Sequence, residues 1–95
     1  MKPSEVNPRN FKVKYILLEN PDFSIAYGNW NKEQYCLAMR WNGYENDSGY
    51  PKTFGHPMWF IIPKSMTFVL AKSLLEFEET DKQLVINLLN ELIKL

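Results

Sequence analysis

The hydrophobic pattern of this chain changes its period once, close to Pro63, and this change limits the folds that the chain can form. Before Pro63, apolar and polar residues alternate over several short runs, which is the two-residue period of half-buried strands. After Pro63, apolar residues recur every three or four positions, as they do on one face of a helix. Strands followed by helices predict an α+β domain.

Three runs before Pro63 have the alternation of strands, and polar connections join them. They cover residues 11–18, 23–30 and 34–41. Because the connections are short, we expect the three strands to form an antiparallel meander. A fourth strand is predicted over residues 58–62, where apolar side chains occupy both faces. That pattern is typical of a strand that is central or covered on both sides.

Two helices are predicted after Pro63, and the first has about 14 residues at helical spacing. Thr80 followed by Gln83 resembles a capping box and predicts the start of the second helix. The apolar residues of the second helix span roughly 200° of its circumference, which is more than one core-facing stripe needs. They are Leu84, Val85, Ile86, Leu88, Leu89, Leu92, Ile93 and Leu95.

Together these elements predict a single domain over residues 1–95, with an antiparallel meander sheet of about four strands and two C-terminal helices packed on one face. Residues 1–10, which contain Pro3 and Pro8, are expected to form a flexible tail. The sheet face opposite the helices keeps apolar and aromatic side chains. A homodimer is the simplest way to bury them.

The charge and the single cysteine bear on partners and compartment. Eleven basic and eleven acidic side chains cancel, so no net field draws the chain to nucleic acid or to an anionic membrane. No apolar run has the length of a signal peptide or the roughly 20 residues of a membrane span. Cys36 has no disulfide partner, which fits a reducing cytoplasm, and its mid-strand place favours a small core residue over a nucleophile.

Residues 39–63 concentrate special residue types and locate the candidate site. They include two of the three Trp, the only His, three of the four Gly and three of the six Pro. A loop is predicted to run from Asn42-Gly43 to about Gly55, and a loop of that length is uncommon unless it is functional or packs on itself. The candidate ligand-binding residues are Arg40, Trp41, Asn42, Tyr50, His56 and Trp59.

The aromatic residues that bracket this loop have two readings. Trp41, Tyr50, Phe54 and Trp59 form an aromatic-walled pocket, to which Asn42 and His56 add polar contacts, or they are the loop's own packing. Both readings stay open on the sequence alone.

Arg40 and His56 carry the chemistry that the segment offers. The Arg40 guanidinium needs a carboxylate, several carbonyls or an anionic ligand, and Glu45 and Asp47 are its plausible partners. A salt bridge that pins the loop is favoured over an anion-binding role. Any general-base mechanism begins with His56, but no second His or nearby acid completes a triad or a metal site. No cofactor and no metal are predicted.

Four short motifs in this segment resemble a known group. They are Arg40-Trp41-Asn42-Gly43, Gly49-Tyr50-Pro51, Gly55-His56-Pro57 and the run from Trp59 to Pro63. Their spacing resembles that of small uncharacterised bacterial proteins, including proteins encoded in mobile integron gene cassettes. The resemblance covers about a quarter of the chain. It implies a bacterial cytoplasmic protein of unknown role and implies no catalytic residue.

Three functions are compatible with these observations. The favoured one is a non-enzymatic binding protein that uses the region from Arg40 to Trp59 for a small molecule or a protein partner. The alternative is a small hydrolase or isomerase that uses His56, with Arg40 as an anion clamp. The third is a structural or assembly module in which the loop forms a dimer seam.

Overall fold

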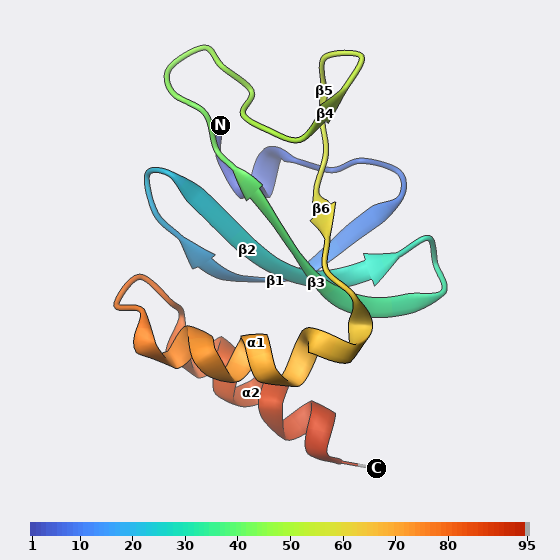
Figure 1. Cartoon of the computed structure of the whole chain (residues 1–95), viewed down its shortest axis with the longest axis vertical. Helices are drawn as coiled ribbons and strands as arrows, with labels where there is room; N and C mark the ends of the chain where they lie inside the picture. The colour runs from blue at the N-terminus through green and yellow to red at the C-terminus, as the bar shows by residue number, and fades with distance from the viewer. Residues whose placement is uncertain (95) are drawn as a thin grey trace.

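The protein is elongated, and its parts follow one another along the long axis. The computed structural model describes residues 1–94 and measures 41 × 31 × 17 Å along its principal axes. Two helices lie at one end, a sheet lies in the middle, and a loop with a small hairpin extends from the other end (Figure 1). The hairpin consists of β4 (Lys52–Thr53) and β5 (His56–Pro57). This order places residues 42–58 far from the helices.

The main sheet is a four-stranded antiparallel sheet in the order β1-β2-β3-β6. It consists of β1 (Phe11–Glu19), β2 (Phe23–Trp30), β3 (Gln34–Trp41) and β6 (Phe60–Ile61). The three alternating runs of the sequence are therefore confirmed as strands. β2 and β3 pair without interruption, whereas two irregularities interrupt the pairing of β1 with β2.

The prediction of a central fourth strand is wrong. β6 has only two residues and pairs only with β3, so it is an edge strand. Its side chains alternate between the two faces, since Phe60 lies opposite Met39 and Ile61 lies opposite Ala38. Phe60 is 58% exposed. The apolar residues of this segment therefore belong to a strand at the edge of the sheet and are not buried between two neighbouring strands.

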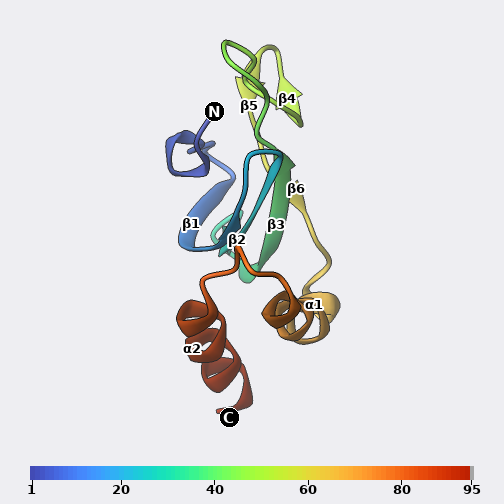
Figure 2. The same cartoon turned by 90° about the vertical axis from the view of Figure 1, so that its left-hand side faces the viewer.

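The helical part consists of two segments that pack on one face of the sheet, as predicted (Figure 2). The first is a mixed segment of 3-10 helix η2 (Lys64–Met66), α1 (Thr67–Ser73) and 3-10 helix η3 (Leu74–Glu76), and the second is α2 (Lys82–Ile93). The core between sheet and helices centres on Leu17, Leu37, Leu74 and Leu88, all at most 1% exposed.

The predicted capping box is displaced by one residue. Asp81, not Thr80, caps α2, and its side chain accepts a hydrogen bond from the Leu84 N–H. The Thr80 hydroxyl instead donates to the Leu74 carbonyl oxygen at 2.6 Å, which ties η3 to the start of α2. The predicted apolar set of α2 extends to Leu95, which lies outside the described residues.

The other face of the sheet is covered by the chain's own N-terminal segment. Val6 is 1% exposed and packs with Phe11, Cys36 and Trp59, and the Trp59 indole Nε1 donates to the Val6 carbonyl oxygen at 3.1 Å. Residues 1–10, expected as a flexible tail, therefore include an apolar anchor that follows a short 3-10 helix, η1 (Pro3–Glu5). Hydrophobic periodicity did not predict that the N-terminal segment covers the sheet, because Val6 is an isolated apolar residue and forms no periodic pattern with its neighbours.

This cover changes two expectations. Cys36 is fully buried, as predicted, and burial raises the pKa of its thiol. The apolar face on which the homodimer prediction rested is occupied by Val6 and Trp59, so this face does not require a second copy. The homodimer itself stays a prediction. Within residues 1–94, no helix has the length and apolar character needed to cross a membrane.

We expect Val6→Ala to lower the free energy of unfolding by about 2 kcal/mol, because the loss of buried methyl groups leaves a cavity beside Trp59. Arg9→Ala, an exposed change in the same segment, is the control. Chemical denaturation measures both. A Val6→Ala effect within about 0.5 kcal/mol of wild type would show that the segment does not pack as described.

Candidate functional site

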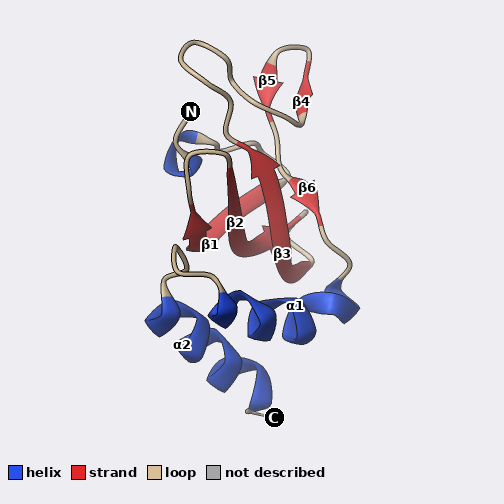
Figure 3. Cartoon of the chain, turned by 60° about the vertical axis from the view of Figure 1, so that its left-hand side comes forward, coloured by secondary structure: helices blue, strands red, loops and turns tan. Residues whose placement is uncertain are grey.

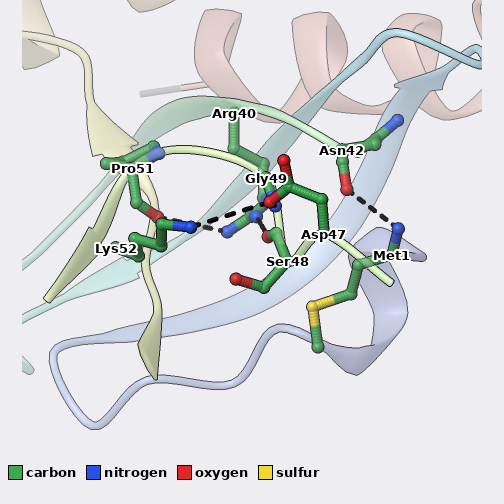
Figure 4. Close-up of polar contacts among 8 residues, drawn as sticks. All are labelled: Met1, Arg40, Asn42, Asp47, Ser48, Gly49, Pro51 and Lys52. Carbon is green, nitrogen blue, oxygen red and sulfur yellow. Dashed lines mark hydrogen bonds and ion pairs between the residues drawn. The ribbon is translucent and has the colours of Figure 1, made fainter. Parts of the chain in front are cut away.

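Arg40 is the centre of the segment that the sequence singled out. Its side chain is 1% exposed although it carries a charge. The guanidinium donates from Nη1 to the Met58 carbonyl oxygen at 2.6 Å and to that of Pro51 at 3.5 Å, and from Nη2 to the Ser48 carbonyl oxygen. Figure 4 shows the guanidinium lying among the loop's backbone. A single side chain thus binds three separate points of the 42–58 segment.

No carboxylate pairs with Arg40 among the described residues, so the predicted salt bridge to Glu45 or Asp47 is wrong. Asp47 pairs instead with Lys52, at 3.6 Å between Oδ1 and Nζ (Figure 4). Burial without a counter-charge lowers the pKa of the Arg40 guanidinium, but carbonyl dipoles satisfy its N–H groups and keep it charged. Of the three guanidinium nitrogens, only Nε has no hydrogen-bond partner within residues 1–94.

Asn42 is a second buried junction and not a ligand contact. Its side chain is 5% exposed, accepts a hydrogen bond from the Ser24 hydroxyl at 2.8 Å and donates to the Asn20 carbonyl oxygen at 2.8 Å. Its backbone N–H donates to the Asp22 carbonyl oxygen at 2.8 Å. These bonds join the end of β3 to the turn between β1 and β2.

Trp41 and Tyr50 face each other across an antiparallel bridge. Each backbone N–H donates to the other's carbonyl oxygen, at 2.7 Å from Trp41 and at 3.0 Å from Tyr50. Both side chains are exposed, Trp41 to 55% and Tyr50 to 63%. An edge-to-face contact with Phe23, at 6.0 Å between ring centroids, holds the Trp41 ring. These two residues fit the predicted aromatic wall.

Trp41 and Tyr50 stand between two hollows. The larger hollow has a volume of about 420 Å³, and its lining includes Asp22, Tyr44 and Asp47. The smaller hollow has about 110 Å³ and is lined on its other side by Met39 and Phe60. Trp41 and Tyr50 therefore line both a hollow that contains charged side chains and a mainly apolar one.

The remaining predicted residues lie elsewhere. Trp59 is 4% exposed and belongs to the core beside Val6, so it is not available to a ligand. His56 is exposed on β5 and lines a separate groove with Glu5 and Arg9 of the N-terminal segment. No hydrogen bond or ion pair within the described residues joins His56 to Arg40. The six candidate residues thus divide into three that are exposed (Trp41, Tyr50, His56) and three that are buried (Arg40, Asn42, Trp59).

Several exposed residues of the site were not among the six candidate ligand-binding residues. Tyr44 is 70% exposed and its hydroxyl donates to the Asp22 carboxylate, and Phe60 lies at the mouth of the smaller hollow. Phe54 is 99% exposed at the tip of the β4–β5 hairpin, where its φ of 49° lies in the left-handed region that bulky residues rarely adopt. The sequence named Phe54 as part of the aromatic wall, but Phe54 lines neither hollow beside Trp41. Asp22 came from a distant turn and had no sequence signal.

Comparisons with protein-family models, with curated proteins and with solved structures give no significant match to this chain. The resemblance to small bacterial cassette proteins therefore stays a prediction. In the part of the chain that the structure describes, no three His, Cys, Asp or Glu side chains are grouped as metal ligands. The arrangement provides exposed aromatic rings on a backbone that buried hydrogen bonds hold in place.

We expect Arg40→Met to lower the free energy of unfolding by about 1–3 kcal/mol, because the partly buried carbonyl groups of Ser48 and Met58 lose their charged donor. Arg40→Lys is expected to recover only part of this loss, since an ammonium cannot reach all three acceptors. Denaturant titration measures the stability, and limited proteolysis within residues 42–58 measures the order of the loop. Equal stability of the three proteins would contradict this role.

Two glycines test the close packing of the site against backbone strain alone. Gly49 and Gly55 have φ values of 77° and 80°. A Cβ at Gly49 would overlap the Trp41 carbonyl oxygen and lie 2.7 Å from the Arg40 Nη2, whereas a Cβ at Gly55 meets nothing within 4 Å. We expect Gly55→Ala to cost about 1 kcal/mol from strain and Gly49→Ala to cost about 1–3 kcal/mol more. Similar losses from the two changes would contradict the packing around Arg40.

Proposed function

We propose that this protein is a non-enzymatic binding protein that engages a partner through the aromatic surface around its 42–58 segment. The observation that carries this proposal is the exposure of five aromatic side chains on or beside this segment, each between 55% and 99% exposed: Trp41, Tyr44, Tyr50, Phe54 and Phe60. All of them except Phe54 line two hollows that share Trp41 and Tyr50. Aromatic residues are enriched where proteins bind partners, and contiguous exposed apolar surface usually marks an interaction site.

The rigid support of this surface favours binding. Arg40 and Asn42 are buried beneath it and hold its backbone through charged and amide hydrogen bonds. A surface that is ordered before binding loses less conformational entropy when a partner arrives. The buried polar residues of the predicted site therefore act as support, and the exposed aromatic residues make the contact.

The enzymatic alternative has less support. An anion clamp needs an accessible guanidinium, whereas Arg40 is 1% exposed and its N–H groups are directed at carbonyl oxygens. His56 lines the groove with the N-terminal segment and does not line either hollow beside Trp41. A general base has to lie within hydrogen-bond reach of the reacting group, and His56 is absent from the lining of both hollows.

The balanced charge of the chain favours a protein or small-molecule partner over nucleic acid. In keeping with the sequence motifs, we place this binding protein in a bacterial cytoplasm. Sizing the protein in solution decides whether the partner is a second copy, as the predicted homodimer and the assembly-module alternative require.

Affinity capture with matched variants tests the proposal. The wild-type protein and three alanine variants, Trp41→Ala, Phe54→Ala and Phe77→Ala, are immobilised and exposed to bacterial extract. Phe77 is 45% exposed but lies between the two helical segments, so it is the control. We expect wild type and Phe77→Ala to retain the same partner in stoichiometric amounts.

Trp41→Ala is expected to weaken that capture by at least tenfold, as the loss of a buried aromatic anchor does at protein interfaces. Circular dichroism verifies that each variant is folded. Equal capture by all four proteins would refute the proposal. It would also be refuted if the wild-type protein captured no partner and formed no dimer with itself.

A further inference from the structure

The larger hollow beside Trp41 has features that the proposed binding function does not by itself explain. Three aromatic residues line it, namely Trp41, Tyr44 and Tyr50, and two carboxylates join them, those of Asp22 and Asp47. The remaining charged residue of the lining is Lys52. The charged side chains of the lining therefore sum to one net negative charge, and the Met1 ammonium, which donates to the Asn42 carbonyl oxygen at 2.8 Å, lies outside the lining.

Both carboxylates are held in place by neutral or already paired groups. Asp22 accepts the hydrogen bond of the Tyr44 hydroxyl, and it takes part in no ion pair within residues 1–94. Asp47 accepts a hydrogen bond from the Gly49 N–H at 2.9 Å, and its ion pair with Lys52 spans 3.6 Å (Figure 4). The Gly49 hydrogen bond and the Lys52 charge lower the pKa of Asp47, which keeps it ionised. Asp22 therefore supplies the uncompensated charge.

The aromatic walls attract the same kind of group as the carboxylates. The face of an aromatic ring carries negative potential, and Trp is the strongest of the aromatic side chains in binding cations. The Phe23 edge-to-face contact and the Tyr44 hydrogen bond to Asp22 fix the orientation of two of these rings. Their exposure leaves ring surface free for a ligand.

We propose that the larger hollow binds an organic cation of the alkylated ammonium class, with the charged head against Trp41, Tyr44 and Tyr50 and its charge balanced by Asp22. This inference rests on the proposed function and names the chemistry that the aromatic surface recognises. The volume of about 420 Å³ lies within the size range of small-ligand sites and accommodates a quaternary ammonium head.

A neutral polar ligand fits this hollow less well. A neutral ligand such as a sugar leaves the charge of Asp22 uncompensated, because Lys52 is engaged with Asp47. An anion is disfavoured by the net negative charge. A quaternary ammonium group makes no hydrogen bond and needs only aromatic faces and a nearby negative charge.

The test is a titration with choline, followed through the indole N–H signals of the three Trp residues by NMR. Trp41 is expected to shift, whereas buried Trp59 serves as an internal reference. The neutral isostere of choline, in which carbon replaces nitrogen, is expected to bind at least tenfold more weakly, because it lacks the charge that the rings and Asp22 attract. Added salt is expected to weaken choline binding.

Charge-only variants identify the residues responsible. Asp22→Asn keeps the acceptor for the Tyr44 hydroxyl but removes the charge, and it is expected to weaken choline binding by about three- to tenfold. Trp41→Leu is expected to abolish the binding. Glu78→Gln, an exposed change between the helical segments, is the control and is expected to leave the affinity unchanged.

The source of the cation is decided by comparing choline with a short peptide that contains trimethyllysine. Tighter binding of the peptide assigns the cation to a protein side chain, and equal binding assigns it to a free small molecule, and either result supports a cation site. Equal binding of choline and its neutral isostere, or no Trp41 shift with either cation, overturns the inference. If capture of a partner still depends on Trp41 in that case, the proposed function stands and only the cation chemistry fails.

Discussion

The buried guanidinium of Arg40 organises the end of the molecule on which its candidate function depends. It lies at the end of β3, 1% exposed, and donates hydrogen bonds to the carbonyl oxygens of Ser48, Pro51 and Met58. A charge is buried only when its hydrogen-bonding capacity is met, and backbone carbonyls meet it here in place of an acid. Three points of this segment are thereby tied to the end of β3. Figure 3 shows the segment as the loop and small hairpin that extend beyond the sheet, away from the helices.

The hydrogen bonds of Arg40 explain why the polar residues of the site are buried while its aromatic residues are exposed. The side chains of Arg40 and Asn42 are buried and hydrogen-bonded within the protein. Trp41 lies between them in the sequence and points outward, because successive side chains of a strand point to opposite faces. The same alternation exposes Tyr50 across the bridge from Trp41. The buried and exposed residues of the motif are therefore two halves of one arrangement, in which the buried half fixes the positions of the exposed half.

The sequence predicted most of the sheet and the helices, because hydrophobic periodicity reports burial directly. β2 and β3 have the predicted bounds, and Cys36 is buried. Periodicity failed where burial came from a distant or irregular segment: Val6 covers the sheet from a polar stretch, and β6 is apolar on both faces although it is a short edge strand. The Arg40 partner was misassigned because a sequence shows which acids lie near but not where backbone carbonyls converge.

The central claim is that the 42–58 segment is as ordered as the sheet because Arg40 holds it at Ser48, Pro51 and Met58. Backbone order parameters from NMR relaxation test this claim most directly. The claim predicts values near 0.85 for the amides of these residues, similar to those of β3. Values below about 0.6 would show a loop that moves independently of Arg40 and would contradict the account of a preformed aromatic surface.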